Sequence, residues 1–131
     1  MKKILFVTLL CLTLTACGGT PSTTIDVTMT DFQYGPAEFT VPAGQVITLN
    51  AVNNGAVLHE FVIFKLGKTA GEKFGDEDEE NIYWEVEVDP GASKSATFTA
   101  PSEPGEYFVT CGIAGHLEAG MNAKLIVVAS K

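Results

Sequence analysis

Positive charge is scarce in this sequence, which carries 8 Lys and Arg residues against 16 Asp and Glu residues. Proteins bind nucleic acids through clusters of Lys and Arg, so this balance argues against a nucleic-acid partner. A long apolar run is lacking too, because the run at residues 4–14 is too short to span a bilayer. Internal repeats and long stretches with helical periodicity are also absent, which argues against repeat proteins and helix bundles.

Hydrophobic residues are, by contrast, well represented. They make up 46% of the 131 residues, and charged residues make up 18%. This is the composition of a globular protein with a packed core, and the length suits one ordinary domain.

The N-terminus has the layout of an export signal. Lys2 and Lys3 precede the apolar run, which leads to Leu-Thr-Ala-Cys at residues 14–17. That segment resembles a bacterial lipobox, in which the cysteine receives a diacylglycerol and becomes the first residue of the mature chain. We therefore expect lipidation of Cys17, with an ordinary secretory cleavage site as the alternative.

This interpretation divides the chain into three parts: a lipoprotein signal peptide at 1–16, a flexible tether from lipidated Cys17 at 17–24, and the folded domain at 25–131. Loss of the signal removes two lysines and no acid, so six positive and sixteen negative residues remain, a net charge of −10. We expect an exported monomer, anchored by lipid at a membrane and facing the periplasm or the cell exterior.

Cysteine is scarce as well, with 3 residues in the chain. Cys11 leaves with the signal and Cys17 carries the lipid, so the domain keeps one thiol, Cys111. A disulfide within the domain is therefore excluded. A lone thiol in an oxidising compartment calls for an intermolecular partner, deep burial or metal coordination.

The apolar residues of the domain recur with a period of two, which is typical of half-buried strands. Turn signals rich in Gly, Pro and Asn separate the strands, and residues 67–83 have room for a short helix. An all-β sandwich or barrel of seven to eight strands is predicted. The strand candidates are 25–29, 45–52, 58–65, 84–88, 93–98, 106–111 and 123–128.

Four residues with metal-binding side chains form the strongest pattern in the sequence. The first is His59, and the others follow at regular spacing as Cys111-x4-His116-x4-Met121. If 106–111 and 123–128 are neighbouring strands, the loop between them presents its three ligands around one point. Glycines at 112, 115 and 120 allow that loop to bend.

The chemistry of these donors selects copper. Two imidazoles and a thiolate with a weak axial thioether define an electron-transfer copper site, whereas zinc sites do not use methionine. Taken singly, each residue has a simpler interpretation as core or loop packing. Met29 illustrates this, because it lies in strand alternation away from any His or Cys, and we interpret it as core.

These residues resemble the cupredoxin family of blue copper proteins over nearly the whole domain. Three stretches carry the resemblance: Val-Pro-Ala-Gly at 41–44, Val-Leu-His-Glu-Phe at 57–61 and Pro-Gly-Glu-Tyr-Phe-Val-Thr-Cys at 104–111. The ligand spacing is similar to that of the auracyanin and rusticyanin branches.

The resemblance implies a Greek-key β-sandwich that binds one type 1 copper. His59, Cys111 and His116 would be equatorial ligands, with Met121 axial and His116 nearest the surface. Two features depart from the plastocyanin and azurin branches: Glu60 stands where Asn is usual, and the loop from Cys111 to His116 has no proline.

A single-electron carrier, cycling one copper between Cu(I) and Cu(II), is the function that this pattern favours. Copper sequestration or delivery is the alternative, although the Met and His tracts often seen in such proteins are missing. A copper enzyme needs more histidines than the two present. A thiol hydrolase using Cys111 would leave Met121 without a role.

Redox proteins are the expected donor and acceptor, with a cytochrome as one candidate. Two surfaces are candidates for docking. One is apolar, around His116, with loop packing as its alternative interpretation; it comprises Ile113, Ala114 and Leu117. The other is an acidic run that would steer a positively charged partner, with a plain solvated loop as its alternative; it comprises Asp76, Glu77, Asp78, Glu79 and Glu80.

Overall fold

The computed structural model describes residues 19–130. The predicted signal peptide at 1–16 and the predicted lipidation site Cys17 lie outside the described residues. Among the residues described, no helix is both long and apolar enough to cross a bilayer. The end of the predicted tether is already attached to the domain, because the Ser22 N–H donates to the Thr40 carbonyl at 3.0 Å and the first strand begins at Thr24.

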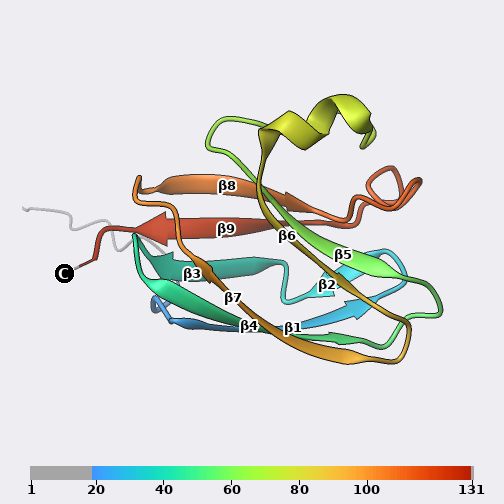
Figure 1. Ribbon diagram of the computed structural model, residues 1–131, viewed down its shortest axis with the longest axis horizontal. Coiled ribbons are helices and arrows are strands. Elements are labelled where there is room, and N and C mark those ends of the chain that lie inside the picture. The colour runs from blue at the N-terminus through green and yellow to red at the C-terminus, as the bar shows by residue number, and fades with distance from the viewer. Residues whose placement is uncertain (1–18, 131) are drawn as a thin grey trace, which may run out of the picture.

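Within residues 19–130, nine strands form two sheets packed face to face (Figure 1). This confirms the predicted all-β sandwich. The elements are β1 Thr24–Thr30, β2 Gln33–Gly35, β3 Glu38–Pro42, β4 Val46–Asn53, β5 His59–Phe64, the 3-10 helix η1 Asp76–Asn81, β6 Ile82–Val88, β7 Ser93–Thr99, β8 Gly105–Thr110 and β9 Asn122–Val128.

The two sheets have the strand orders β2-β1-β4-β7 and β3-β9-β8-β5-β6. Two neighbouring pairs, β1 with β4 and β3 with β9, run parallel, and the other pairs are antiparallel. The chain changes sheets after β2, β3, β4, β6 and β7, so each sheet is built from segments distant in sequence. This interleaving brings the loop before β5 and the loop after β8 to the same end of the sandwich.

Alternation in the sequence decides which side chains enter the core. In β1 every second residue is buried, which places Ile25, Val27 and Met29 inside. The same rule in β5 puts His59 on the inner face with Phe61 and Ile63. Burial of these side chains supplies the main stabilisation of the fold, at about 25 cal/mol per Å² of apolar area.

A second apolar cluster covers the outer face of β5 and β8, so β5 is buried on both sides. Val62 and Phe64 point outward into it, and residues 65–81 with η1 lie over them (Figure 1). Leu117, from the loop after β8, packs into this same cluster. The predicted short helix within 67–83 is therefore present, as a cover for the second cluster.

Two strands were not predicted, and they raise the count from seven or eight to nine. β2 has three residues, too few to display a period. β3 ends at Pro42, within the Val-Pro-Ala-Gly segment at 41–44 that has the composition of a turn. The chain turns at Gly44, which has a φ of +68°. Pro42 is tolerated because β3 lies at a sheet edge, where one side of the backbone needs no partner.

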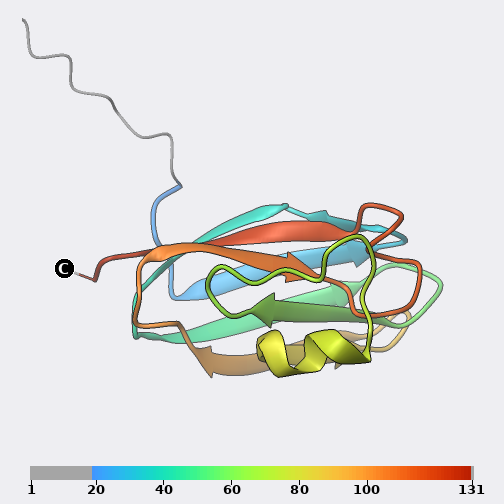
Figure 2. The same ribbon diagram turned by 90° about the horizontal axis from the view of Figure 1, so that it is seen from above.

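The two ends of the sandwich have different roles. The described chain starts and ends at one end of the sandwich, and the loops that carry the predicted ligands lie at the other (Figure 2). The β1 to β2 turn and residues 53–59 also reach this second end. Any site formed there is a full strand length away from the point where the described chain enters the domain.

Replacement of Phe61 by Ala should lower the free energy of unfolding by about 3–5 kcal/mol. Phe61 is fully buried and has edge-to-face contacts with Tyr34 and Phe39, so its removal leaves a cavity between the sheets. Chemical denaturation of the copper-free protein measures the change. The control is Val46→Ala on an exposed position, expected to change stability by about 0.5 kcal/mol or less. Equal effects in the two variants would contradict the assigned core.

Candidate metal centre

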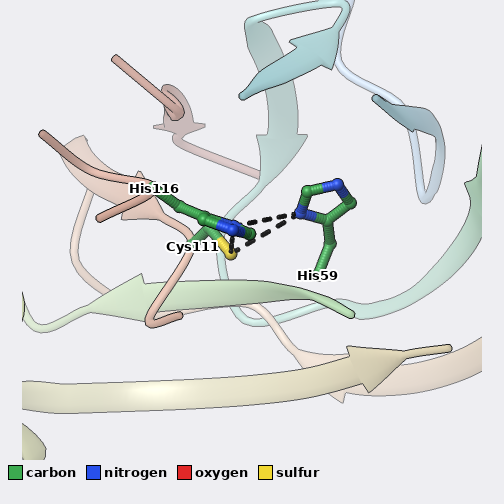
Figure 3. Close-up of side chains that lie close together, drawn as sticks. All are labelled: His59, Cys111 and His116. Atoms are coloured by element: carbon green, nitrogen blue, oxygen red, sulfur yellow. Dashed lines mark hydrogen bonds between the residues drawn. The ribbon is translucent and has the colours of Figure 1, made fainter. Parts of the chain in front are cut away.

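Three of the predicted ligands converge at the end of the core (Figure 3). The Nδ1 atoms of His59 and His116 are 3.2 Å apart. The Cys111 Sγ is 3.2 Å from the His116 Nδ1 and 4.0 Å from the His59 Nδ1. All three residues are buried. Donors at these separations fit around one first-row metal ion, whose bonds to nitrogen and sulfur are roughly 2.0–2.3 Å long.

Two neighbouring strands, β5 and β8, bring these donors together at one end of the sandwich. His59 is the first residue of β5, and Cys111 directly follows β8, the neighbour of β5 in the sheet. Of the two histidines, His116 has the larger exposed fraction, 6% against 0% for His59. The sequence expectation that His116 lies nearest the surface is thus confirmed.

The ligand loop at 111–121 is held by its own backbone. The His116 N–H donates to the Ile113 carbonyl at 3.0 Å, and the Met121 N–H donates back to the His116 carbonyl at 2.9 Å. The loop closes where the Cys111 N–H donates to the Met121 carbonyl at 3.3 Å. Gly115 and Gly120 have φ values of +85° and +96°, which few other residues adopt, so both tight bends depend on glycine.

Met121 is paired through its backbone with the ligand Cys111. Its side chain is fully buried in the main core cluster, together with Cys111. Its carbonyl also accepts a hydrogen bond from the Thr110 hydroxyl at 3.1 Å. A thioether placed there completes the donor set that selects copper.

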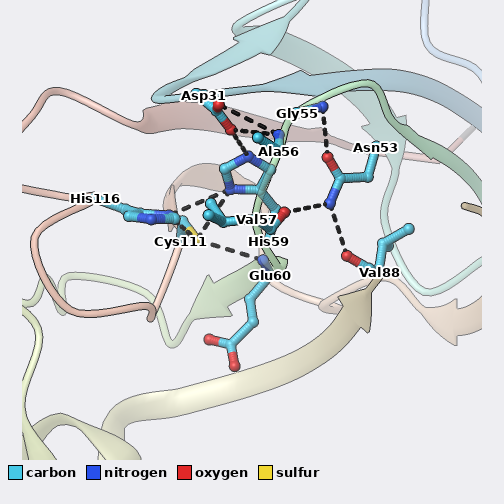
Figure 4. A network of polar contacts seen from close by, with 10 residues as sticks. All are labelled: Asp31, Asn53, Gly55, Ala56, Val57, His59, Glu60, Val88, Cys111 and His116. Carbon is cyan, nitrogen blue, oxygen red and sulfur yellow. Dashed lines mark hydrogen bonds and ion pairs between the residues drawn. The ribbon is translucent and has the colours of Figure 1, made fainter. Parts of the chain in front are cut away.

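The sulfur of Cys111 lies in a nearly dry site. Burial raises the pKa of its thiol, and backbone N–H groups of Glu60 and Ile113 act in the opposite direction. The Glu60 N–H points at Sγ from 3.3 Å (Figure 4). This N–H is aimed at the atom that becomes negative when the thiol loses its proton to a metal.

The two imidazoles are prepared for coordination in different ways. Burial, with the neighbouring His59, lowers the pKa of His116, against Asp31 and Glu118, which raise it. His116 is therefore neutral at neutral pH and free to donate its lone pair. His59 is held on its outer side, where its Nε2 lies 3.1 Å from the Oδ1 of Asp31. This contact leaves Nδ1 to face the other donors.

Asn53 fixes the loop that precedes His59. Its Nδ2 donates to the carbonyls of Val57 and Val88 at 2.8 and 2.9 Å, and its Oδ1 accepts from the Gly55 N–H at 2.8 Å (Figure 4). Asn53 is fully buried. Because all of these polar atoms are paired, the loop has one favoured conformation, and with it the start of β5.

The sequence and the fold both match known copper proteins. The family described as Cupredoxin-like domain matches residues 3–127. The chain belongs to this cupredoxin family. His59, Cys111 and His116, with Met121, are arranged in this cupredoxin as a type 1 copper site.

Relatives of this cupredoxin include a copper-resistant cuproprotein, CopI, from Rubrivivax gelatinosus. It is 33% identical over 111 residues, which span 79% of this chain and 66% of that protein. Reduced auracyanin from Roseiflexus castenholzii has 32% identity and a TM-score of 0.69, covering 83% of this chain and 99% of its own. Auracyanin A from Chloroflexus aurantiacus, a blue copper protein, has 28% identity and a TM-score of 0.65, covering 83% and 100%.

The predicted docking residues have different surroundings in this cupredoxin. Ala114 is exposed, and Ile113 is half-buried against the main core. Leu117 is buried in the second cluster, which is the packing role that the sequence left as the alternative. The acidic run forms most of η1, where Asp78 is buried and accepts a hydrogen bond from the Gly75 N–H.

The acidic run and the ligand loop share one surface depression of about 710 Å³. Its walls carry five carboxylates, and Gly112 and Ala114 of the ligand loop form one side. Burial raises the pKa of the Glu60 carboxyl, and Glu87 and Glu85 add to this, while a hydrogen bond from Gly112 lowers it. The carboxylates belong to Glu60, Asp76, Glu79, Glu85 and Glu87.

Several site residues escaped the sequence analysis. Asn53 was read only as part of a turn, and Asp31 carried no signal, because a lone acid after a strand is common. Phe32 was also missed, although its ring lies edge-to-face on His116 with centroids 5.1 Å apart. Only the fold reveals that Asp31 and Phe32 contact metal ligands and that Asn53 fixes the loop before one of them.

The copper-free protein should lose stability at alkaline pH through Cys111. The folded thiol keeps its proton to a higher pH than the unfolded thiol, whose pKa is about 8.5. Its contribution is therefore complete below about pH 8.5 and is lost as the pH rises through the folded pKa, with a slope of up to about 1.4 kcal/mol per pH unit.

Urea denaturation across the alkaline range measures this slope in the wild type and in Cys111→Ser. The variant should show a shallower decline, because its hydroxyl does not ionise there. The variant should keep the part of the decline in stability that comes from Tyr34, whose pKa is raised by burial. Identical slopes would mean that the Cys111 thiol is not desolvated by folding.

Proposed function

We propose that this protein is a single-electron carrier whose ligands are His59, Cys111, His116 and Met121. The convergence of two imidazoles and one thiol in a buried triangle is the observation that supports this most directly. Copper bound there supplies one-electron chemistry by alternating between Cu(I) and Cu(II).

The surroundings of the ligands suit electron transfer because they resist movement. His59 begins a strand that is buried on both faces, and Cys111 is tied to Met121 through the backbone. The ligand loop is further held by Leu117 in the second cluster. A site that keeps one arrangement in both oxidation states needs little reorganisation for each electron.

Copper sequestration or delivery is the second candidate, because the CopI relative is named as a copper-resistant cuproprotein. Delivery requires a metal that an acceptor protein can reach. His59, Cys111 and Met121 are fully buried, and His116 is nearly so. This burial favours the carrier over the delivery protein.

An enzymatic role is the weakest candidate. The chain has two histidines in all, and both belong to the copper site. A multicopper oxidase has a related fold, with a TM-score of 0.59 and 17% identity, which extends to the fold alone. A second copper that binds substrate would need histidines that this chain does not have.

We further propose export and lipid attachment through Cys17, on the strength of the lipobox at 14–17. The described chain starts at the end of the sandwich opposite to the ligand loops (Figure 2). An anchor at that end leaves the copper end turned away from the membrane, where redox proteins of the periplasm or cell exterior have access to it. The carrier would act there as a monomer.

The acidic depression is the proposed docking face for a positively charged partner, such as a cytochrome. Asp76 and Glu79 line it together with Ala114 of the ligand loop. A cationic partner attracted there arrives next to the loop that carries His116. Ile113 and Ala114 would supply its apolar contact, whereas Leu117 is buried and is left out of this surface.

Addition of Cu(II) to the copper-free domain should produce an intense visible band from charge transfer between thiolate and copper, at one copper per chain. Reversible one-electron voltammetry should accompany the band. Absorption titration and voltammetry measure the two properties. The control is Cys111→Ser, which keeps a side chain of similar size but should remove the band. A band that survives in this variant would refute the proposed ligand set.

A carrier and a delivery protein differ in how firmly they hold copper. The loaded wild type should keep its visible band in a moderate chelator through repeated cycles of reduction and oxidation, because the donors are buried. Competition with the chelator, followed at the visible band, tests this. Rapid loss of copper in the reduced state would favour delivery instead.

The double variant Asp76→Asn, Glu79→Gln should slow association with a cationic cytochrome several-fold at low salt and weaken its salt dependence. Stopped-flow electron transfer measures the rate. The matched control is Asp26→Asn, Glu103→Gln, which removes two exposed charges at the far end of the sandwich. Equal rates in both double variants would reject the docking face. The visible spectrum should not change in either.

A further inference from the structure

One short turn touches the surroundings of three metal ligands, and the copper chemistry described above does not account for it. It joins β1 to β2 in the sheet opposite to the one that carries β5 and β8. Asp31 and Phe32 form this turn, and Tyr34 lies just beyond it in β2; each of the three contacts a different ligand or a residue that supports one. We call residues 31–34 the support turn.

Asp31 contacts His59 directly. Its Oδ1 is 3.1 Å from the His59 Nε2, and both of its carboxylate oxygens accept from the Ala56 N–H at 3.1 and 3.2 Å (Figure 4). The carboxylate thus fixes the outer nitrogen of the ring and the loop that precedes it. A histidine that donates its outer N–H to a carboxylate becomes a more basic ligand at its inner nitrogen.

The chain makes room for this contact at Gly55. A Cβ at that position would lie 2.3 Å from the Asp31 Oδ1 and 2.7 Å from the His59 Nε2. Neither atom belongs to the flexible end of a long side chain, so neither can retreat without breaking the contact. The glycine is therefore matched to the pair of Asp31 and His59.

Phe32 contacts the second imidazole. Its ring meets His116 edge-to-face, with centroids 5.1 Å apart and planes at 79°. The residue has a φ of +73°, which is an outlier for a bulky side chain, and it is 42% exposed. A left-handed backbone that presents an apolar ring to water is unfavourable unless the contact that it makes is needed.

Tyr34 reaches the third ligand through one residue, Glu60. Its hydroxyl donates to the Glu60 carbonyl, and the Glu60 N–H points at the Cys111 Sγ from 3.3 Å. The Tyr34 ring is buried between the sheets against Phe61. The tyrosine thereby sets the orientation of the strand segment whose N–H faces the sulfur.

We propose that the support turn is a positioning device for the copper site, in which Asp31 orients His59, Phe32 covers and orients His116, and Tyr34 aligns the N–H that Glu60 offers to Cys111. The device rests on the proposed copper function and adds to it a role for residues outside the ligand set. Since the turn comes from the opposite sheet, it also locks the two sheets together at the copper end.

Asp31 has the most specific consequence, because it brings a negative charge to a ligand. A more basic His59 stabilises Cu(II) more than Cu(I), so the carboxylate holds the reduction potential down. Asp31→Asn keeps an oxygen of the same shape but removes the charge. We expect a higher potential and an affinity for Cu(II) reduced by about 10-fold or more.

The matched control is Asp26→Asn, which makes the same change within β1, the strand that ends just before Asp31. Asp26 accepts a hydrogen bond from Asn50 at 2.9 Å and is exposed, so it too is a paired surface carboxylate. Asp31 is five positions further along the chain, roughly 16 Å away at the rise of an extended strand. Its replacement should leave the potential and the copper affinity of the wild type nearly unchanged.

Two further variants keep the test independent of folding. Asp31→Glu retains the charge on a longer side chain and should recover part of the lost affinity. Tyr34→Phe should shift the energy of the visible band, which reports on sulfur, with little effect on the His59 ring. Thermal unfolding of each copper-free variant separates loss of fold from loss of positioning.

Voltammetry, copper competition and NMR of the His59 ring nitrogens in the copper-free protein supply the measurements. The proposal is supported if Asp31→Asn raises the potential and moves the His59 nitrogen resonances while Asp26→Asn does neither. It is overturned if Asp31→Asn and Asp26→Asn have equal effects on the potential and on the His59 resonances. The contact between Asp31 and His59 would then add nothing to the general effect of a surface charge. A wild type without a visible band would instead refute the copper function, whereas the NMR result on copper-free protein would still stand.

Discussion

Two imidazoles and one thiol gathered in a space closed to water are the constraint on which the rest of this structure depends. Buried polar groups without partners are destabilising by roughly 1–3 kcal/mol each. Within residues 19–130, every fully buried side-chain nitrogen and oxygen atom has a partner. His59 is satisfied on its outer side by Asp31, and Cys111 faces the Glu60 N–H. The inward lone pairs are left for a metal.

The sandwich meets this constraint by holding the ligands from several directions. His59 is carried by a strand buried on both faces. The ligand loop has Leu117 in the outer cluster and Met121 in the main core, so it is fixed on both sides of the sheet. The turn of the opposite sheet closes the third side. Each of these contacts belongs to a different packed part of the protein. No single low-energy motion can therefore move all of the donors at once.

The charged groups around the metal site lie in distinct places. Five carboxylates near the site line the depression beside η1, whereas Asp31 faces the outer nitrogen of His59 and the neutral donors point inward. Glu60 contributes to both the metal site and the depression. Its backbone N–H points at the Cys111 sulfur, and its side chain lines the depression with Glu85 and Glu87. A redox protein of this kind can present a strong field to a partner and still keep its metal in dry surroundings, with Asp31 as the carboxylate that contacts a ligand.

The sequence by itself determined the donor set, the metal and the layered all-β fold, because ligand chemistry and strand alternation are local properties. His59, Cys111 and Met29 could be assigned from spacing and period alone. Only the tertiary structure decided what surrounds the donors. Asp31, Phe32 and Tyr34 reach the ligands from another sheet, and Leu117 turns out to be buried under residues 65–81. Such contacts depend on how sheets cross and stack, which no short stretch of sequence encodes.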